Sequence, residues 1–192
     1  MRTRPSSNRP SSTNFLAALA LLAIDEILDI VDGNDNVIGT ATRAAVHSEN
    51  YRHRAVHILV FDAARRIYLQ KRSKSKDNSP GLWDTSAAGH VDSGESYRVA
   101  ANRELTEELG LPIESDLEEL FKLDAKPATG FEFAVVYRHE TTLEPIPDPI
   151  EIAEGRWIDS DTLNHWLDEH PNDFTETFRE IWSIYGSMHT AR

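Results

Sequence analysis

Three glutamates, Glu104, Glu107 and Glu108, stand close together in a segment whose apolar spacing predicts a helix over residues 95–109. Glu104 and Glu108 are one helical turn apart, so both belong to one face, and Glu107 lies at the edge of that face. Carboxylates stacked in this way repel each other and weaken a helix unless a cation binds between them. Oxygen ligands suit Mg²⁺ or Mn²⁺, which take one or two carboxylates together with water and phosphate oxygens. The two interpretations are therefore a solvated acidic helix face and a divalent-metal site.

The residues around these glutamates complete a longer pattern. Gly89 begins it, Glu95 follows after five intervening residues, and Arg103 follows after seven more. An arginine here can pair with Glu95 and clamp the preceding loop onto the helix. Gly110 is a helix-stop residue, and the bulky apolar Leu111 follows it. Together these residues read G-x5-E-x7-R-E-U-x-E-E-x-G-U, where U is bulky and apolar, and this complete pattern favours the metal site.

This pattern resembles the Nudix box, the signature motif of the Nudix hydrolase superfamily. The resemblance implies an α/β (α+β) fold, an α/β/α sandwich with a mixed β-sheet and a loop–helix–loop catalytic motif. It also implies cleavage of a diphosphate linked to another moiety, usually a nucleoside diphosphate linked to X, with Mg²⁺ or Mn²⁺ as cofactor. Bound metal lowers the pKa of an attacking water and polarises the phosphorus.

The resemblance carries over residue by residue. It implies that the metal ligands are Glu104, Glu107, Glu108 and the backbone carbonyl of Gly89. A second implication is that Glu95 and Arg103 are the orienting pair of the motif. A carboxylate is the general base in this superfamily, and its position varies. The candidates in this chain are Glu107 and Glu132.

From about residue 37 to residue 185, the chain also resembles one branch of the superfamily, the type I isopentenyl-diphosphate isomerases and their hydrolase relatives. The stretches that carry this resemblance are HRAVHILVF, LQKRSKSKDNSPGLWDTSAAGH and GFEFAVVY. In that isomerase a cysteine precedes the Gly-His of the box, whereas this chain has Ala88 there and contains no cysteine. The missing proton-donating thiol and the complete box both favour hydrolysis over double-bond isomerisation.

The same branch binds a second metal through histidines and glutamates. His53 and His90 match two of those ligands, and Glu132 matches one of two strand carboxylates. The other carboxylate falls at Gly130, and His47 lies near a further ligand position with a spacing that differs by one residue. The resemblance therefore implies that His53 and His90 are metal ligands.

A cluster of cations precedes the box. Arg72 and Lys76 match the cations that bind diphosphate in the isomerase, and Lys71 and Lys74 lie beside them. We expect Arg72 and Lys76 to bind substrate phosphate, the alternative being a solvated loop. Trp83, just after this cluster, is predicted to pack under the box loop.

The elements that must position these residues alternate between strands and helices. Turn residues 32–35 between two apolar stretches predict a hairpin, and the β-branched run at 53–61 predicts a buried strand. The pattern predicts further strands over 66–70, 117–123, 131–137 and 156–158, a loop over 71–82, and closing helices over 161–169 and 173–185. This alternation is typical of an α/β or α+β sandwich.

The composition excludes several kinds of function. The chain has 192 residues, with 20 Lys and Arg against 32 Asp and Glu, so its net charge is −12. An acidic surplus cannot neutralise the phosphates of a nucleic-acid polymer, although a few cations or a metal suffice for a small phosphorylated ligand. Since cysteine is absent, disulfides, Cys-ligated zinc, iron–sulfur clusters and thiolate nucleophiles are excluded. Any metal must be bound through oxygen or imidazole.

Residues 1–24 differ in composition from the rest of the chain. They contain three arginines and no acidic residue, and they end in an apolar run over residues 15–24 that is too short to span a bilayer. Three interpretations are open: a secretory signal, an Arg- and Ser-rich transit peptide, and a disordered extension or an early start codon. The rest is typical of a cytoplasmic enzyme without membrane contact, and residues 25–192 are predicted to form a single Nudix domain.

Three functions are compatible with these observations. The leading hypothesis is a Mg²⁺-dependent Nudix hydrolase whose partner is a small-molecule diphosphate, and homodimers are frequent among its relatives. The second is an isopentenyl-diphosphate isomerase-like enzyme, which Ala88 opposes. The third is a non-catalytic Nudix ligand-binding module, but such domains tend to lose box carboxylates, and this chain retains all of them.

Overall fold

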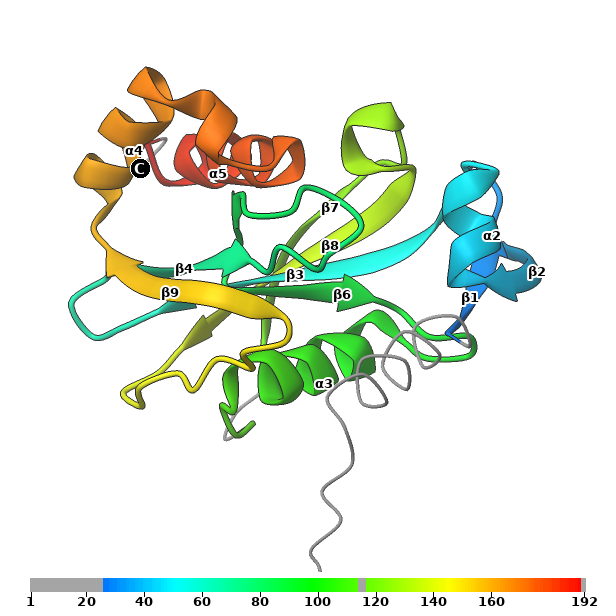
Figure 1. Cartoon of the computed structure of the whole chain (residues 1–192), viewed down its shortest axis with the longest axis horizontal. Coiled ribbons are helices and arrows are strands. Elements are labelled where there is room, and N and C mark those ends of the chain that lie inside the picture. Colours follow the sequence, from blue (N-terminus) through cyan, green and yellow to red (C-terminus); the bar gives the residue numbers. More distant parts are fainter. Residues whose placement is uncertain (1–25, 114–116, 191–192) are drawn as a thin grey trace, which may run out of the picture.

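The computed structural model describes residues 26–113 and 117–190, and its centre is a mixed β-sheet between two layers of helices (Figure 1). Within these residues the main sheet has seven strands, and a separate two-stranded hairpin stands at one end. The strands are β1 (Ile27–Val31), β2 (Val37–Thr42), β3 (His53–Phe61), β4 (Ile67–Arg72), β5 (Trp83–Asp84), β6 (Ala87–His90), β7 (Glu118–Leu123), β8 (Glu132–Glu140) and β9 (Ile152–Ile158). The helices are α2 (Arg43–Ser48), α3 (Tyr97–Leu109), α4 (Ser160–Glu169) and α5 (Glu176–Thr190), with 3-10 turns η1 (Pro127–Thr129) and η2 (Pro171–Asp173). This arrangement confirms the predicted α/β/α sandwich.

Strand β3 lies in the middle of the sheet. β8 runs parallel to it and pairs Glu132 with His53, while β6 runs antiparallel to it and pairs His90 with Ala55. The other pairs in the main sheet are antiparallel, so the sheet is mixed. The start of β3 therefore lies beside the start of β8 and the end of β6, and side chains from three strands meet there.

Side chains of β3 alternate between two apolar cores. Leu59 is buried in the same core as Phe178 of α5, and its neighbour Ile58 is buried in the same core as Leu105 of α3. Because successive strand residues point to opposite faces, one continuous apolar run fills both cores. Figure 1 shows the result, with α3 on one face of the sheet and α4 and α5 on the other.

Helix α3 begins at Tyr97, two residues after the predicted start. The Ser96 backbone is extended, and its side chain accepts a hydrogen bond from the Val99 N–H, which caps the helix. The helix ends as predicted, because Gly110 adopts the left-handed conformation at φ 62° and donates its N–H to the Thr106 carbonyl. Glu95 therefore lies in the loop rather than in the helix.

Helix α2 was not predicted. Its six residues follow β2 directly, and the Thr42 hydroxyl caps it by accepting from the Ala45 N–H. A segment of six residues is too short to show helical periodicity. The helix places Arg43 and His47 one turn apart, and so on the same side.

The C-terminal elements differ from prediction at their boundaries. α5 starts at Glu176 instead of residue 173, because Pro171–Asp173 forms a separate 3-10 turn and the Thr175 hydroxyl accepts from the Phe178 N–H. The interpretation of Trp83 was wrong, since it lies in the core shared with α5, on the face opposite α3. There it meets Trp166 edge to face, with ring centroids 5.4 Å apart.

The predicted boundary at residue 24 and all three interpretations of residues 1–24 lie outside the described residues. Among the residues that the structure does describe, no helix has the length and apolar character needed to cross a membrane.

Asp29 of β1 ties the hairpin to the loop before α3. Its buried carboxylate accepts hydrogen bonds from the Ser93 hydroxyl at 2.7 Å and from the Gly94 N–H at 3.3 Å. Hydrogen bonds to a charged group contribute about 1.5–3 kcal/mol, so we expect Asp29→Ala to lower the free energy of unfolding in urea by about that amount. Asp32→Ala, in the exposed turn of the same hairpin, is the control and should cost less, since water can replace its hydrogen bonds. Equal losses in the two variants would contradict the role of Asp29.

Candidate functional site

The three box glutamates, Glu104, Glu107 and Glu108, form what we call the carboxylate cluster, which lies against β6. Glu104 and Glu108 are buried, whereas the Glu107 side chain is 61% exposed. A methyl group built on Gly89 would lie 2.0 Å from Oε1 and 2.2 Å from Cδ of Glu104. Only glycine therefore lets the β6 backbone approach this carboxylate so closely.

Glu108 is the most enclosed member of the carboxylate cluster. Its Oε2 accepts two hydrogen bonds, from the Ala88 N–H at 3.0 Å and from the Gln70 side-chain amide at 3.0 Å. Burial and repulsion from Glu104 raise the pKa of Glu108 to about 7, and burial also raises the pKa of Glu104. Burial thus disfavours the charged form of both carboxylates. A cation bound between them would stabilise that charged form.

Arg103 connects the loop, β6 and the carboxylate cluster. Its guanidinium forms the predicted pair with Glu95 through contacts of 3.2 Å and 3.0 Å, and it donates to the His90 carbonyl at 3.0 Å. It also donates to Glu104 at 2.5 Å and to Glu107 at 3.3 Å. Burial opposes the charge on Arg103, but the surrounding carboxylates hold its pKa above the ordinary value. Arg103 therefore contacts two of the box glutamates directly, and Glu95 holds Arg103 from the loop.

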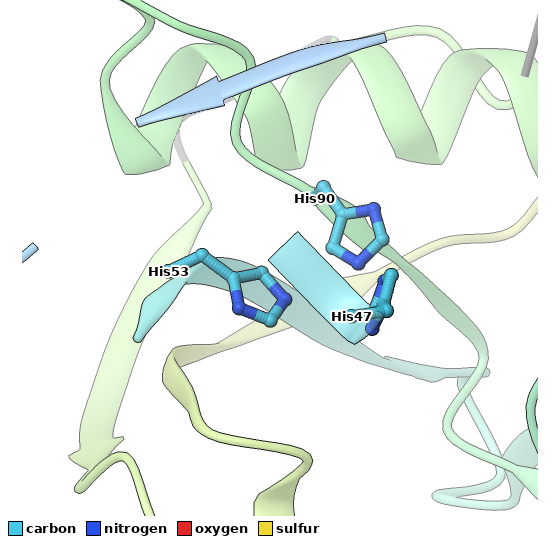
Figure 2. A group of neighbouring side chains, drawn as sticks. All are labelled: His47, His53 and His90. Atoms are coloured by element: carbon cyan, nitrogen blue, oxygen red, sulfur yellow. The ribbon is translucent and has the colours of Figure 1, made fainter. Parts of the chain in front are cut away.

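A second group, His47, His53 and His90, forms what we call the imidazole cluster (Figure 2). One nitrogen from each ring lies within 4.8 Å of one from each of the others. Glu132 closes the group, with its Oε1 3.5 Å from Nε2 of His53 and 3.5 Å from Nε2 of His90. Three imidazoles and a carboxylate thus face one another.

Four elements bring the imidazole cluster together. His53 opens β3, Glu132 opens β8 as its register partner, and His90 ends β6. His47 comes from α2 and was not among the predicted ligands, because its spacing differs by one residue from that of the isomerase pattern. The signal in the sequence was a histidine close to a further ligand position of the isomerase pattern. The sequence alone could not show whether its side chain reaches the other two histidines.

The imidazole cluster has the donor set of a transition-metal site. Nε2 of His47 and Nε2 of His53 are buried, and neither has a hydrogen-bond partner within 26–113 and 117–190. The outer nitrogens are engaged, since Nδ1 of His53 lies 2.9 Å from the Tyr51 carbonyl and Nδ1 of His90 lies 3.0 Å from Glu26. Imidazole and carboxylate ligands suit ions such as Zn²⁺, Mn²⁺ and Fe²⁺. The residues present therefore fit a divalent metal ion.

Within the imidazole cluster, Glu132 and His90 stabilise each other's charged form. Burial would lower the pKa of His90, but contacts with Glu132 and Glu26 raise it to about 9. Burial would raise the pKa of Glu132, but His53 and His90 hold it well below its usual range. Burial and the neighbouring imidazoles lower the pKa of His47 to about 4. A carboxylate with so low a pKa is a weak base, which favours Glu132 as a ligand over its predicted role as general base.

The two clusters lie on opposite sides of one strand. Gly89 faces Glu104 of the carboxylate cluster, and the next residue, His90, belongs to the imidazole cluster. Successive strand residues point to opposite faces, so β6 separates the two clusters by one residue along the chain.

The two predicted phosphate-binding cations already have partners. Arg72 ends β4 instead of lying in a loop, and it donates to Asp84 at 3.2 Å and to the Asn78 carbonyl at 3.0 Å. Lys76 pairs with Glu151. Burial lowers the pKa of Lys76, while the nearby Glu108 and Glu104 oppose that effect, so Lys76 lies close to the carboxylate cluster. An incoming phosphate would have to compete with Glu151 for this lysine.

The amino-acid sequence matches a known domain model and the sequences of known proteins. A model of the NUDIX domain matches residues 51–178. The chain is 34% identical over 161 residues to an isopentenyl-diphosphate Delta-isomerase 2 from Photorhabdus laumondii, covering 82% of this chain and 91% of that protein. It is 35% identical over 154 residues to an uncharacterized Nudix hydrolase from Yersinia pestis, covering 79% of this chain and 82% of that one.

Solved structures agree in fold. The crystal structure of DR0079 from Deinococcus radiodurans superposes with a TM-score of 0.66 at 28% identity, covering 76% of this chain and 90% of that one. The NUDIX domain of Shewanella oneidensis NrtR, determined with ADP ribose, superposes with a TM-score of 0.57 at 15% identity, covering 77% and 99%. At that identity the second likeness concerns the fold alone.

Proposed function

The chain belongs to the Nudix family, and on that premise we propose that it is a divalent-metal-dependent hydrolase of a small organic diphosphate, such as a nucleoside diphosphate linked to X. The observation that carries the proposal is the carboxylate cluster seated on Gly89. Three carboxylates, a glycine backbone and an orienting Arg103–Glu95 pair converge there, and two of the carboxylates are buried against their own electrostatic preference. A purely structural helix face would leave such groups in water.

We assign a role to each residue of the cluster. Glu104, Glu107, Glu108 and the Gly89 carbonyl would hold the metal, for which Mg²⁺ is the first choice and Mn²⁺ the second. When bound, the metal supplies charge neutralisation and a more acidic water. Glu107 is the one exposed carboxylate of the three and is the better placed to accept a proton from water. Arg103 keeps Glu104 and Glu107 in position.

Lys76 and Arg72 would bind the phosphates. Lys76 lies near Glu104 and Glu108, where a substrate held by the metal would arrive. A phosphate there would replace Glu151 as the partner of Lys76. Arg72, already paired with the buried Asp84, would keep that partner and offer its remaining donors.

The imidazole cluster would hold a second divalent ion, with Glu132 as its carboxylate ligand. His53, His90 and Glu132 match ligands of the isomerase-like branch that the sequence resembles, and relatives of this chain bear the name isopentenyl-diphosphate Delta-isomerase. Isomerisation is the second candidate function. Ala88 stands where that isomerase has its proton-donating cysteine, and its methyl group can neither donate nor accept a proton. Hydrolysis requires no such group and is the function we propose.

A release assay tests the proposal. Pure protein with Mg²⁺ or Mn²⁺ is incubated with ADP-ribose, dinucleoside polyphosphates, NADH, nucleotide sugars, coenzyme A and isopentenyl diphosphate, and released phosphate and nucleotide are measured. We expect cleavage of at least one compound and a loss of at least about 100-fold in Glu104→Gln, because the substitution removes a metal ligand at nearly constant volume.

Two outcomes contradict hydrolysis. Conversion of isopentenyl diphosphate to dimethylallyl diphosphate without phosphate release would identify an isomerase. An intact panel, together with a compound that raises the melting temperature, would identify a ligand-binding module.

A further inference from the structure

Glu26 and Arg43 lie directly behind the imidazole cluster and have no place in the mechanism above. Glu26 precedes β1, and Arg43 is the first residue of α2, one turn before His47. Both side chains are partly buried, with 27% and 17% of their surfaces exposed. Two oppositely charged side chains in this position are placed to orient the imidazole cluster in front of them.

The two oxygens of Glu26 have separate partners. Oε1 lies 3.0 Å from Nδ1 of His90, and Oε2 lies 3.3 Å from Nε of Arg43. The backbone joins them again, since the Arg43 N–H donates to the Glu26 carbonyl at 2.8 Å. Arg43 is fixed from its other side by Asp77, at 2.5 Å. The carboxylate of Glu26 therefore cannot rotate freely away from His90.

We infer that Glu26, fixed by Arg43, is a positioning residue that orients His90 and sets its tautomer for metal binding. With Nδ1–H donated to Glu26, the lone pair of Nε2 faces His47 and His53 (Figure 2). Oε1 of Glu132 lies 3.5 Å from the same nitrogen. Carboxylates that accept the outer N–H of a ligating histidine fix its ring and raise its basicity, and their loss commonly costs 10- to 100-fold in metal affinity. The inference rests on the proposed second metal and adds the residues that prepare its site.

The arrangement also joins the metal ligand to the phosphate-binding loop. Asp77, the far partner of Arg43, follows Lys76 directly. A chain of contacts thus runs from His90 through Glu26 and Arg43 to the segment that carries Lys76. Displacing Glu26 should therefore disturb His90 directly and Lys76 only through Arg43 and Asp77.

Cobalt binding tests the inference without reference to catalysis. The Glu108→Gln variant serves as background, so that the carboxylate cluster contributes little to binding, and Co²⁺ is titrated by its visible absorption bands. We expect one bound Co²⁺ in the background protein and a dissociation constant about 10-fold or more higher once Glu26→Gln is added. Glu49→Gln is the matched control, since it removes the same charge at the exposed end of α2, and it should leave the constant unchanged.

The tautomer provides the second readout. In the Zn²⁺-loaded protein, long-range ¹⁵N–¹H NMR should show His90 protonated at Nδ1, and Glu26→Ala should weaken or reverse that preference. Equal Co²⁺ affinity with and without Glu26→Gln, or an unchanged tautomer in Glu26→Ala, would overturn the inference. Absence of Co²⁺ binding in the background protein would overturn it together with the second metal, while the diphosphate assay would still decide the hydrolase proposal.

Discussion

Glu108→Gln is expected to abolish turnover and, at the same time, to stabilise the metal-free protein. Glu108 is a proposed metal ligand, so its loss should lower kcat by at least about 100-fold. Its burial and the charge of Glu104 raise its pKa from 4.5 to about 7. An acid whose pKa is raised on folding destabilises the folded state as pH rises above the unfolded value, and the cost reaches its full size above the folded value. Here the cost is on the order of 3 kcal/mol above pH 7.

The size of the stability effect therefore depends on pH. The variant should melt several degrees above the wild type at pH 8, and the difference should shrink towards zero near pH 4, where Glu108 is protonated in both states. Thermal melts in chelator at several pH values measure this. Glu107→Gln is the control, because its side chain is exposed and its melting temperature should follow that of the wild type. Full activity in Glu108→Gln, or a lower melting temperature at pH 8, would refute the assignment.

Gly89→Ala is expected to cost about 100-fold or more in kcat, because the new methyl group would overlap the Glu104 carboxylate. Its carbon would lie 2.0 Å from Oε1, far inside van der Waals contact, so Glu104 must move. Glu104 is also bound by Arg103, and a displacement of about 1 Å in a reacting assembly can cost about 100-fold. Steady-state kinetics across a range of Mg²⁺ concentrations should show a lower kcat and weaker activation by the metal.

Gly39→Ala is the matched control for this substitution, because no atom lies within 4 Å of the added carbon and activity should stay at the wild-type level. A double-mutant cycle then tests the stated cause. The overlap should also lower the free energy of unfolding of Gly89→Ala, and adding Glu104→Ala should remove most of that cost, since the overlapping carboxylate is gone. If the two costs simply add, the contact between Gly89 and Glu104 is not the reason.

Much of the fold follows from local pattern. The β-branched run of β3, the turn residues of the β1–β2 hairpin and the Gly110 stop of α3 each depend on neighbours in the chain, and the structure confirms all three. Helix α2 and the short strands β5 and β6 were missed, because six, two and four residues are too few to show a period. The placement of Trp83 was wrong because a strand residue can face either core, and sequence does not say which.

The core of the carboxylate cluster follows from helix geometry. Residues four apart on a helix share a face in any fold, so Glu104 and Glu108 come together wherever that helix packs. The imidazole cluster is different, because the resemblance pointed to His53, His90 and Glu132 but neither to His47 nor to the contacts with Glu26 and Arg43. His47, His53, His90 and Glu132 come from four elements, and only the parallel register of β3 with β8, the end of β6 and the position of α2 bring them within reach of one another. The pairs Lys76–Glu151 and His90–Glu26 also join residues far apart in the chain, so they depend on the same packing.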